Sequence, residues 1–235
     1  MRHTLLCAAL GLTLAASTLP ASAQQLLAGP DGLVPVNDTP VFRAEALRGD
    51  AYSIEASRVA LERSRNPKVR ALANRTIEDR QATTDALLPP GSSLTAGGTV
   101  VADGSRGTAF DTPLGFITAP LAIPGAIVGG IVGGNAVVDT RPGEPGKRVA
   151  LDAKRQETLT RLQAERGGRS FDKLYTGQQA VSNLETVALY RDYARTGRSA
   201  VARQFANQAL PMMQDEAEQA ARLHTGGWDE GEAGF

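Results

Sequence analysis

Three charged residues lie on the apolar faces of predicted helices, where a charge is costly unless it is paired. Glu216 lies among apolar residues that recur every three or four positions from Met212 to Leu223, and Glu55 and Arg80 have similar surroundings on two other predicted helices. Burying an unpaired charge costs several kcal/mol, so we expect Arg80 to form an ion pair with Glu216, Glu55 or both inside the protein. The alternative is that all three side chains lie at the edges of their apolar faces and extend to water.

The same charges bear on whether the interior binds a metal ion. The carboxylates with a suitable placement for oxygen ligands are Glu55, Glu78, Asp79, Glu185 and Glu216. Di-iron bundles also use Glu-x-x-His pairs, and no such pair occurs after residue 23. A guanidinium at Arg80 would repel a cation from the same interior. We therefore predict no metal site and no cofactor, and an iron- or manganese-binding oxidoreductase is the alternative.

Residue sets for other kinds of catalysis are not evident. After residue 23 the sequence has one histidine, His224, close to the end of the last predicted helix, and no serine lies in a strand–turn–helix elbow. The glycine-rich stretch GSSLTAGG lacks the lysine of a phosphate-binding loop. We predict no catalytic residues, which favours a non-enzymatic protein.

The elements that position these residues are long helical patterns on either side of a central region rich in glycine and proline. The sequence divides into an N-terminal leader at 1–23, a linker at 24–39, a helix pair at 40–88, an insert at 89–147, further helices at 148–224 and an acidic tail at 225–235. These patterns predict an all-α fold. It is an antiparallel four-helix-type bundle with an extra short helix and a long Gly/Pro-rich apolar insert.

The insert contains 27 consecutive residues without a charge, 112–138. Three prolines oppose one continuous helix, and the 14 residues between Pro124 and Asp139 make only about 21 Å of helix, against a hydrocarbon core of about 30 Å. A single crossing would also place the two groups of helices on opposite sides of the membrane. We expect no full membrane span.

Within the insert, Gly125, Gly129 and Gly133 recur every four residues. The β-branched residues between them are Ile127, Val128, Ile131 and Val132. In a helix this spacing makes a flat glycine face that permits close approach of another helix. Two interpretations follow: the insert packs its valines on the bundle, or it forms a short helix or hairpin that contacts a membrane surface or self-associates.

Two parts of the chain resemble a secreted bacterial family known as domain of unknown function 4142. The stretch from YSIEASRVALERSRNP to RQATTDAL looks like the family's opening helix pair, and SFDKLY with the later ALPMMQDEAEQAARL looks like its C-terminal helices. The resemblance covers 42–88 and roughly 150–224. It implies a fold similar to ferritin-like bundles and an envelope or outer-membrane protein without an agreed reaction.

This sequence departs from the family where the family has histidines. Arg80 follows the Glu-Asp pair of the second helix, Asn183 lies eight residues after the tyrosine of FDKLY, and Glu216 follows the Leu-Pro motif. The family pattern has a histidine at each of these positions. A metal role cannot be transferred to them, and we take Glu55, Arg80, Asn183 and Glu216 as an interior charged cluster instead.

The first 23 residues have the layout of a secretory signal peptide, with Arg2, an apolar run and the small residues Ala21-Ser22-Ala23. Cleavage there removes the one cysteine, Cys7, and leaves 24 of the 25 basic residues against 25 acidic ones. This near-neutral balance excludes the basic surface that nucleic-acid binding requires. We expect a periplasmic or outer-envelope protein that binds or scaffolds an unknown partner, or one that acts on a membrane or on itself through 112–138.

Overall fold

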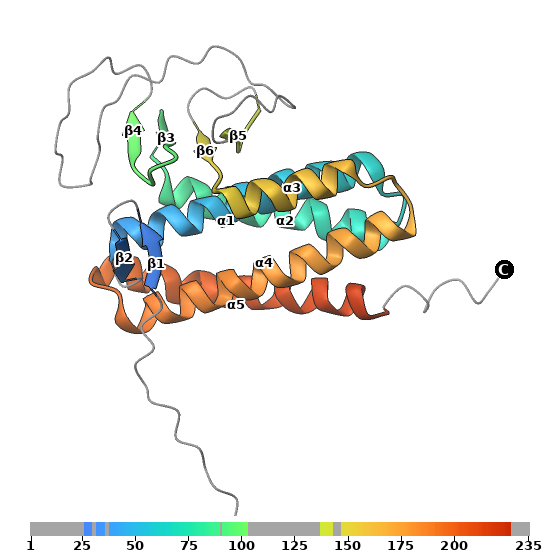
Figure 1. The fold of residues 1–235 in the computed structure, drawn as a ribbon. Helices are drawn as coiled ribbons and strands as arrows, with labels where there is room; N and C mark the ends of the chain where they lie inside the picture. The colour runs from blue at the N-terminus through green and yellow to red at the C-terminus, as the bar shows by residue number, and fades with distance from the viewer. Residues whose placement is uncertain are drawn as a thin grey trace, which may run out of the picture.

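Four long helices run side by side and form the body of the protein in the computed structural model (Figure 1). The helices are α1 Thr39–Arg63, α2 Pro67–Leu87, α4 Arg169–Thr196 and α5 Ala200–Thr225. The residues that the structure describes are 26–29, 32–35, 38–89, 91–102, 137–142 and 147–226, with side chains from residue 38 onward. Three-residue connections join α1 to α2 and α4 to α5, so each pair is antiparallel, and α1 also packs on α4 while α2 packs on α5.

The sequence marks several helix starts with a capping side chain. The Asn66 carboxamide oxygen accepts hydrogen bonds from the backbone N–H groups of Lys68 and Val69, directly before Pro67. Ser199 caps α5 in the same way by accepting from the N–H of Ala202. These caps satisfy amide groups that have no partner within the helix, which fixes where each helix begins.

Small and aromatic side chains share the core between the helices. Phe42 of α1 stacks on Tyr193 of α4 with ring centroids 3.9 Å apart, and meets Tyr190 edge-on at 5.2 Å. Elsewhere the helices meet through buried alanines, among them Ala46, Ala51, Ala56, Ala60, Ala73, Ala206 and Ala220. Alanine lets two helices approach closely, so the bundle is filled although the chain has few aromatic residues.

The all-α prediction was incomplete, because short strands accompany the helices. A four-stranded mixed sheet has the order β4-β3-β6-β5. Its strands are β3 Ser92–Leu94, β4 Val100–Ala102, β5 Val137–Asp139 and β6 Arg148–Ala150. The two central strands are parallel, and each outer strand is antiparallel to its neighbour. The fold is predominantly helical, and the predicted helix from residue 148 begins only at Ala153, because 148–150 pair as a strand.

A second pair of strands lies in the segment that the sequence analysis treated as a linker. β1 Leu26–Gly29 and β2 Gly32–Pro35 pair as an antiparallel hairpin before α1. Residues 24–39 therefore contain regular structure, which the short apolar run around two glycines did not distinguish from a loop.

The ends of the insert are anchored while its middle lies outside the described residues. β5 and β6 pack on α1, and Arg58 of that helix donates hydrogen bonds to the backbone carbonyls of Asp139, 2.6 Å, and Thr140, 2.9 Å. The glycine-rich segment with Gly125, Gly129, Gly133, Ile127, Val128, Ile131 and Val132 falls within 103–136, outside the described residues. Among the helices that the structure describes, none has the length and hydrophobicity to cross a bilayer.

Candidate functional site

The centre of the bundle holds a cluster of charged groups around Arg80. Its guanidinium donates hydrogen bonds to Glu216 Oε2 at 2.5 Å, to Asn183 Oδ1 at 3.0 Å and to Asp50 Oδ1 at 3.4 Å. Asp50 belongs to α1, Arg80 to α2, Asn183 to α4 and Glu216 to α5, so each long helix contributes one side chain. All four side chains have 0% of their surface exposed. We call these four residues the Arg80 cluster.

Hydrogen bonds from α2 hold the carboxylate of Asp50 in place. The Thr83 hydroxyl donates to Asp50 Oδ2 at 2.7 Å, and the Thr84 hydroxyl lies 3.5 Å from the same oxygen. Both threonines lie one turn after Arg80 on the same face of α2. One helix thus supplies both the cation and the hydroxyl donors for a carboxylate on its neighbour.

Burial changes the protonation of the two acidic groups. Burial raises the pKa of Asp50 to about 6 and that of Glu216 to about 7, against the opposing attraction of Arg80. For Arg80 itself burial disfavours the charge, but Glu216 and Asp50 outweigh that cost and the pKa of the guanidinium is raised. With one cation and two carboxyl groups, the cluster is neutral when one carboxyl is protonated, and the two acids titrate as a coupled pair.

The structure contains the predicted ion pair between Arg80 and Glu216, and it brings Asn183 to the same guanidinium. It does not bring Glu55 there. Glu55 is half-buried and pairs with Arg58 on its own helix at 3.3 Å. Five residues separate Asp50 from Glu55, a rotation of about 140° around the helix, so only one of them can face the bundle centre. Asp50 takes the place that we predicted for Glu55.

Asp50 carried a signal that the sequence analysis missed. It follows Leu47 by three residues and precedes Ile54 by four, so it lies within the apolar stripe of α1 and not beside it. All three residues are fully buried. An acidic residue inside such a stripe is the stronger candidate for an internal ion pair.

The Arg80 cluster does not fit a di-iron centre. A guanidinium occupies the middle of the site, and in the described part of the chain no three histidine, cysteine or acidic side chains come together as a metal would require. Of the other predicted oxygen donors, Asp79 pairs with Arg75 at 3.4 Å and Glu185 with Lys154 at 2.6 Å, while Glu78 is exposed. None of these three carboxylates pairs with Arg80.

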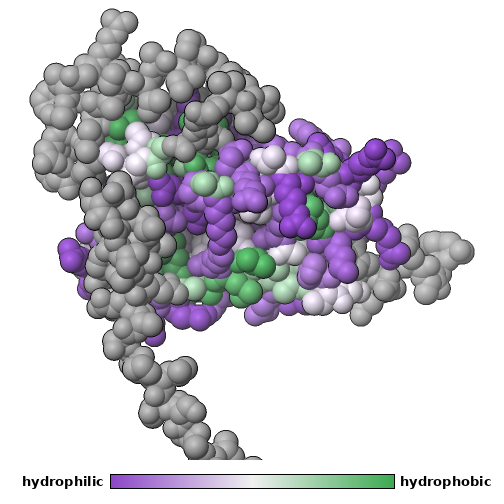
Figure 2. Space-filling model, in the orientation of Figure 1, coloured by the Kyte–Doolittle hydropathy of each residue, from purple (hydrophilic) through white to green (hydrophobic). Residues whose placement is uncertain are grey.

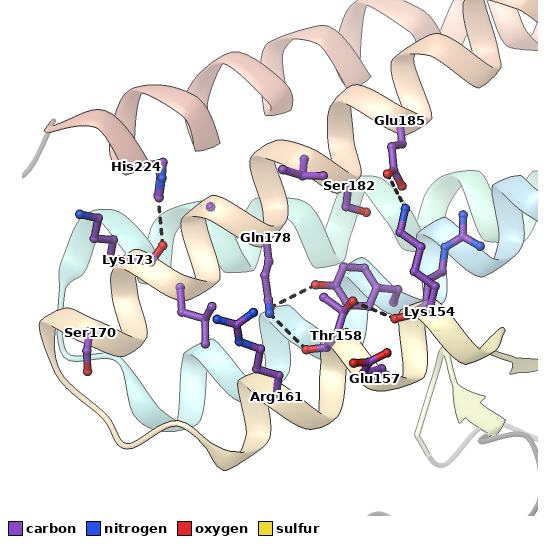
Figure 3. Close-up of a pocket in the computed structure, with 15 residues that line it drawn as sticks. Lys154, Glu157, Thr158, Arg161, Ser170, Lys173, Gln178, Ser182, Glu185 and His224 are labelled. Carbon is purple, nitrogen blue, oxygen red and sulfur yellow. Dashed lines mark hydrogen bonds and ion pairs between the residues drawn. The ribbon is translucent and has the colours of Figure 1, made fainter.

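A second site lies at the surface, in a groove between α4 and the short helix α3, Ala153–Ala164 (Figure 3). The groove has a volume of about 670 Å³. Tyr52 of α1 donates to Gln178 at 3.2 Å, and Gln178 in turn donates to the carbonyl of Thr158 at 3.2 Å, so hydrogen bonds connect α1, α4 and α3 across its floor. A volume of this size is in the usual range for a ligand or peptide site.

The groove is lined by apolar side chains and, at its two ends, by charged ones. Leu174 and Val181 of α4 line it, and Val181 is 58% exposed. Figure 2 shows hydrophobic side chains at the surface along α4, surrounded by hydrophilic ones. At one end the Lys154–Glu185 pair spans the groove from α3 to α4. At the other end, Arg161 and Lys173 form no ion pair within the described residues.

His224 of α5 closes the end of the groove that Arg161 and Lys173 line. Its Nδ1 donates to the carbonyl oxygen of Lys173 at 3.1 Å, so its ring lies across α4. Gly177 makes this approach possible, because a Cβ at that position would lie 2.8 Å from the His224 ring. The histidine is therefore a packing element between α5 and α4.

The fold and site together define a predominantly helical bundle whose interior charges compensate one another and whose surface carries an open groove. The chain belongs to the family described as Domain of unknown function (DUF4142), whose model matches residues 22–93 and 138–223. The family expected from the helix motifs is thereby confirmed. The match omits residues 94–137, the central part of the insert. No curated protein and no solved structure matches the chain.

Proposed function

We propose that this protein is a non-enzymatic helical-bundle protein of the bacterial cell envelope, exported through residues 1–23, that binds or scaffolds a partner. The observation that carries the proposal is the closure of the Arg80 cluster. Arg80, Asp50 and Glu216 have no exposed surface, and both carboxylates pair with Arg80, so no substrate reaches them. The bundle is ferritin-like in this proposal, with an ion pair at the position where such bundles hold metal.

Export is tested by fractionating cells that make the full chain with a C-terminal tag. We expect the tagged protein in the periplasmic or envelope fraction, with Gln24 as its first residue by N-terminal sequencing. A variant without residues 2–23 should stay in the cytoplasm. Recovery of the full chain in the cytoplasm with Met1 retained would contradict the envelope assignment.

The non-enzymatic role is tested by metal analysis of the protein purified from that fraction. We expect iron and manganese well below one ion per chain, both before and after incubation with either metal. Stoichiometric metal, together with oxidation of added Fe²⁺, would replace the binding role with that of a ferritin-like oxidoreductase. A substitution control is Glu216→Gln, which replaces a carboxylate ligand by a neutral amide and should leave the metal content unchanged.

A second role, contact with a membrane or self-association through 112–138, is favoured by the topology of the small sheet. β4 and β5, which precede and follow residues 103–136, belong to the same sheet, and the helices on both sides of the insert share one core. Both ends of the insert therefore lie on the same side of any membrane that it contacts. That arrangement suits a segment that enters a surface and returns.

The test compares the full chain with a variant that lacks residues 112–136 and keeps β5 intact. If the insert acts on membranes, the full chain stays with the membrane fraction after a high-pH wash and the variant does not. If it drives self-association, only the full chain forms oligomers in solution. Equal behaviour of the two proteins in both assays would remove this second role.

A further inference from the structure

The end of the groove at His224 carries exposed cations beside apolar surface. Arg161 of α3 and Lys173 of α4 are exposed and form no ion pair among the described residues. Arg169 lies beside Lys173 and His224 in an adjoining hollow. The acidic side chains nearby are Glu157 on the groove wall and Glu165, which accepts a hydrogen bond from Ser170 at 2.9 Å. Arg161 and Lys173 can therefore each accept an added carboxylate partner, next to the apolar surface of Leu174.

The chain itself supplies a segment of complementary chemistry, which begins at this end of the groove. α5 ends at Thr225, and Gly226 follows it. Both residues line the hollow together with Lys173. The next residues, 227–235, read GWDEGEAGF and lie outside the described residues. Within them are Trp228 and the three acidic residues Asp229, Glu230 and Glu232, without any basic residue.

The distance that the segment must cover is short. Because an extended chain advances at most about 3.6 Å per residue, Trp228 lies within ~7 Å of Gly226 and Asp229 within ~11 Å. Lys173 is next to this starting point, since its carbonyl bonds the ring of His224, two residues before Gly226. A tethered segment also has a high effective concentration at a neighbouring site, in the millimolar range for a short linker.

We propose that residues 227–232 dock in cis into the His224 end of the groove, with the Trp228 ring on the apolar surface of Leu174 and the carboxylates beside Arg161 and Lys173. An indole offers a large apolar face and an N–H donor, which suits a groove with apolar and polar walls. The carboxylates supply ion-pair partners for Arg161 and Lys173. The groove is then a site for an acidic, aromatic peptide segment, and the protein's own chain occupies it.

The test uses intrinsic fluorescence, because Trp228 is the only tryptophan in the chain. In the docked state the emission maximum lies at a shorter wavelength than that of free tryptophan, and acrylamide quenches it weakly. The double variant R161E/K173E reverses the charge of two exposed residues, so we expect the emission to move to that of solvent-exposed tryptophan. High salt should cause a partial shift in the same direction, because it screens exposed charges.

Matched variants separate docking from general effects. Arg191→Glu reverses an exposed charge on α4 that lies 14 residues beyond Gly177, about 21 Å along the helix, and should leave the emission unchanged. Reversing the segment as well, with D229K, E230K and E232K added to R161E/K173E, should restore the short-wavelength emission. Circular dichroism confirms that each variant keeps its helices.

Solvent-exposed emission of Trp228 in the unaltered protein at low salt would overturn the proposal. Short-wavelength emission that R161E/K173E leaves unchanged would overturn it as well, because the tryptophan would then be buried elsewhere. A dependence of the emission on protein concentration would show that a second copy, and not the same chain, supplies the segment. The docking does not depend on export or on metal content, so its failure and that of the proposed envelope role are distinguishable.

Discussion

Two groups of cations in this molecule have opposite surroundings. Arg80 has no exposed surface and lies between two carboxylates and a carboxamide. Arg161 and Lys173 are exposed and have no ion-pair partner in the described part of the chain. The acids that the interior cation requires come from the surrounding helices, whereas no acid on the described helices forms an ion pair with the two cations of the groove.

This difference in burial and pairing indicates that Arg80 supports the fold, whereas Arg161 and Lys173 can bind a ligand or peptide. A buried ion pair repays the cost of desolvation only with close geometry, so its members depend strongly on one another. An exposed ion pair contributes little to stability because water and salt screen it. Substitutions should therefore reduce folding stability at Arg80 and should affect ligand or peptide binding at Arg161 and Lys173.

The largest effect should follow from Arg80→Met. This substitution leaves two carboxyl groups in the core without their cation, and we expect the free energy of unfolding to fall by about 3–5 kcal/mol. Urea denaturation followed by circular dichroism measures it. The matched variant Arg161→Met, which removes an exposed cation, should stay close to the unaltered protein. A loss below about 1 kcal/mol for Arg80→Met would remove the contrast between the two sites.

The next effect concerns pH. The folded-state pKa is about 6 for Asp50, raised from 3.8, and about 7 for Glu216, raised from 4.5. Between the ordinary and the folded-state pKa of each group, the folded protein keeps a proton on the carboxyl that the unfolded chain has already released. Raising the pH through this range therefore lowers the free energy of unfolding. From pH 5 to pH 8 we expect the free energy of unfolding to fall by a value on the order of 4 kcal/mol.

Variants assign this pH dependence to the Arg80 cluster. Glu216→Gln should flatten the decline between pH 5 and pH 8, because the group with the higher pKa no longer titrates. Glu55→Gln, which alters a carboxylate outside the cluster, should leave the decline as it is. An unchanged decline in Glu216→Gln would mean that another group carries the dependence.

The smallest effect should come from neutralising the groove. In R161Q/K173Q we expect the free energy of unfolding to change by less than about 0.5 kcal/mol, because exposed side chains without ion pairs contribute little to folding. Thermal unfolding at neutral pH measures this change. A loss above about 2 kcal/mol would show that these cations support the fold, and the distinction between the two sites would fail.

The sequence predicted the bundle and much of its interior because both depend on local patterns. Helix periodicity and the Asn66-Pro67 cap define the long helices, and the charge at Arg80 within an apolar face required a partner. Glu216 and Asn183 were assigned to the same interior. The choice of Glu55 over Asp50 was wrong because we judged flanking residues and not the rotation of about 140° that separates the two side chains.

Other parts depend on contacts that no local pattern records. Each strand of the four-stranded sheet has three residues, and β3 meets β6 only after more than fifty intervening residues, through the pair Leu94 and Val149. Such strands are too short to show an alternating pattern. The groove arises from the placement of α3 beside α4, and its lining residues belong to three regions of the chain that tertiary packing brings together.

The sheet also fixes the positions of the two strands between which the central part of the insert lies. β4 and β5 are its two edge strands, separated by two others. At about 4.8 Å per strand step, their axes lie about 14 Å apart. Because β4 and β5 run parallel, the end of β4 and the start of β5 lie at opposite edges of the sheet, and a linker of about eight residues spans this diagonal. We expect that the segment between them can be exchanged for such a linker while the bundle keeps its fold.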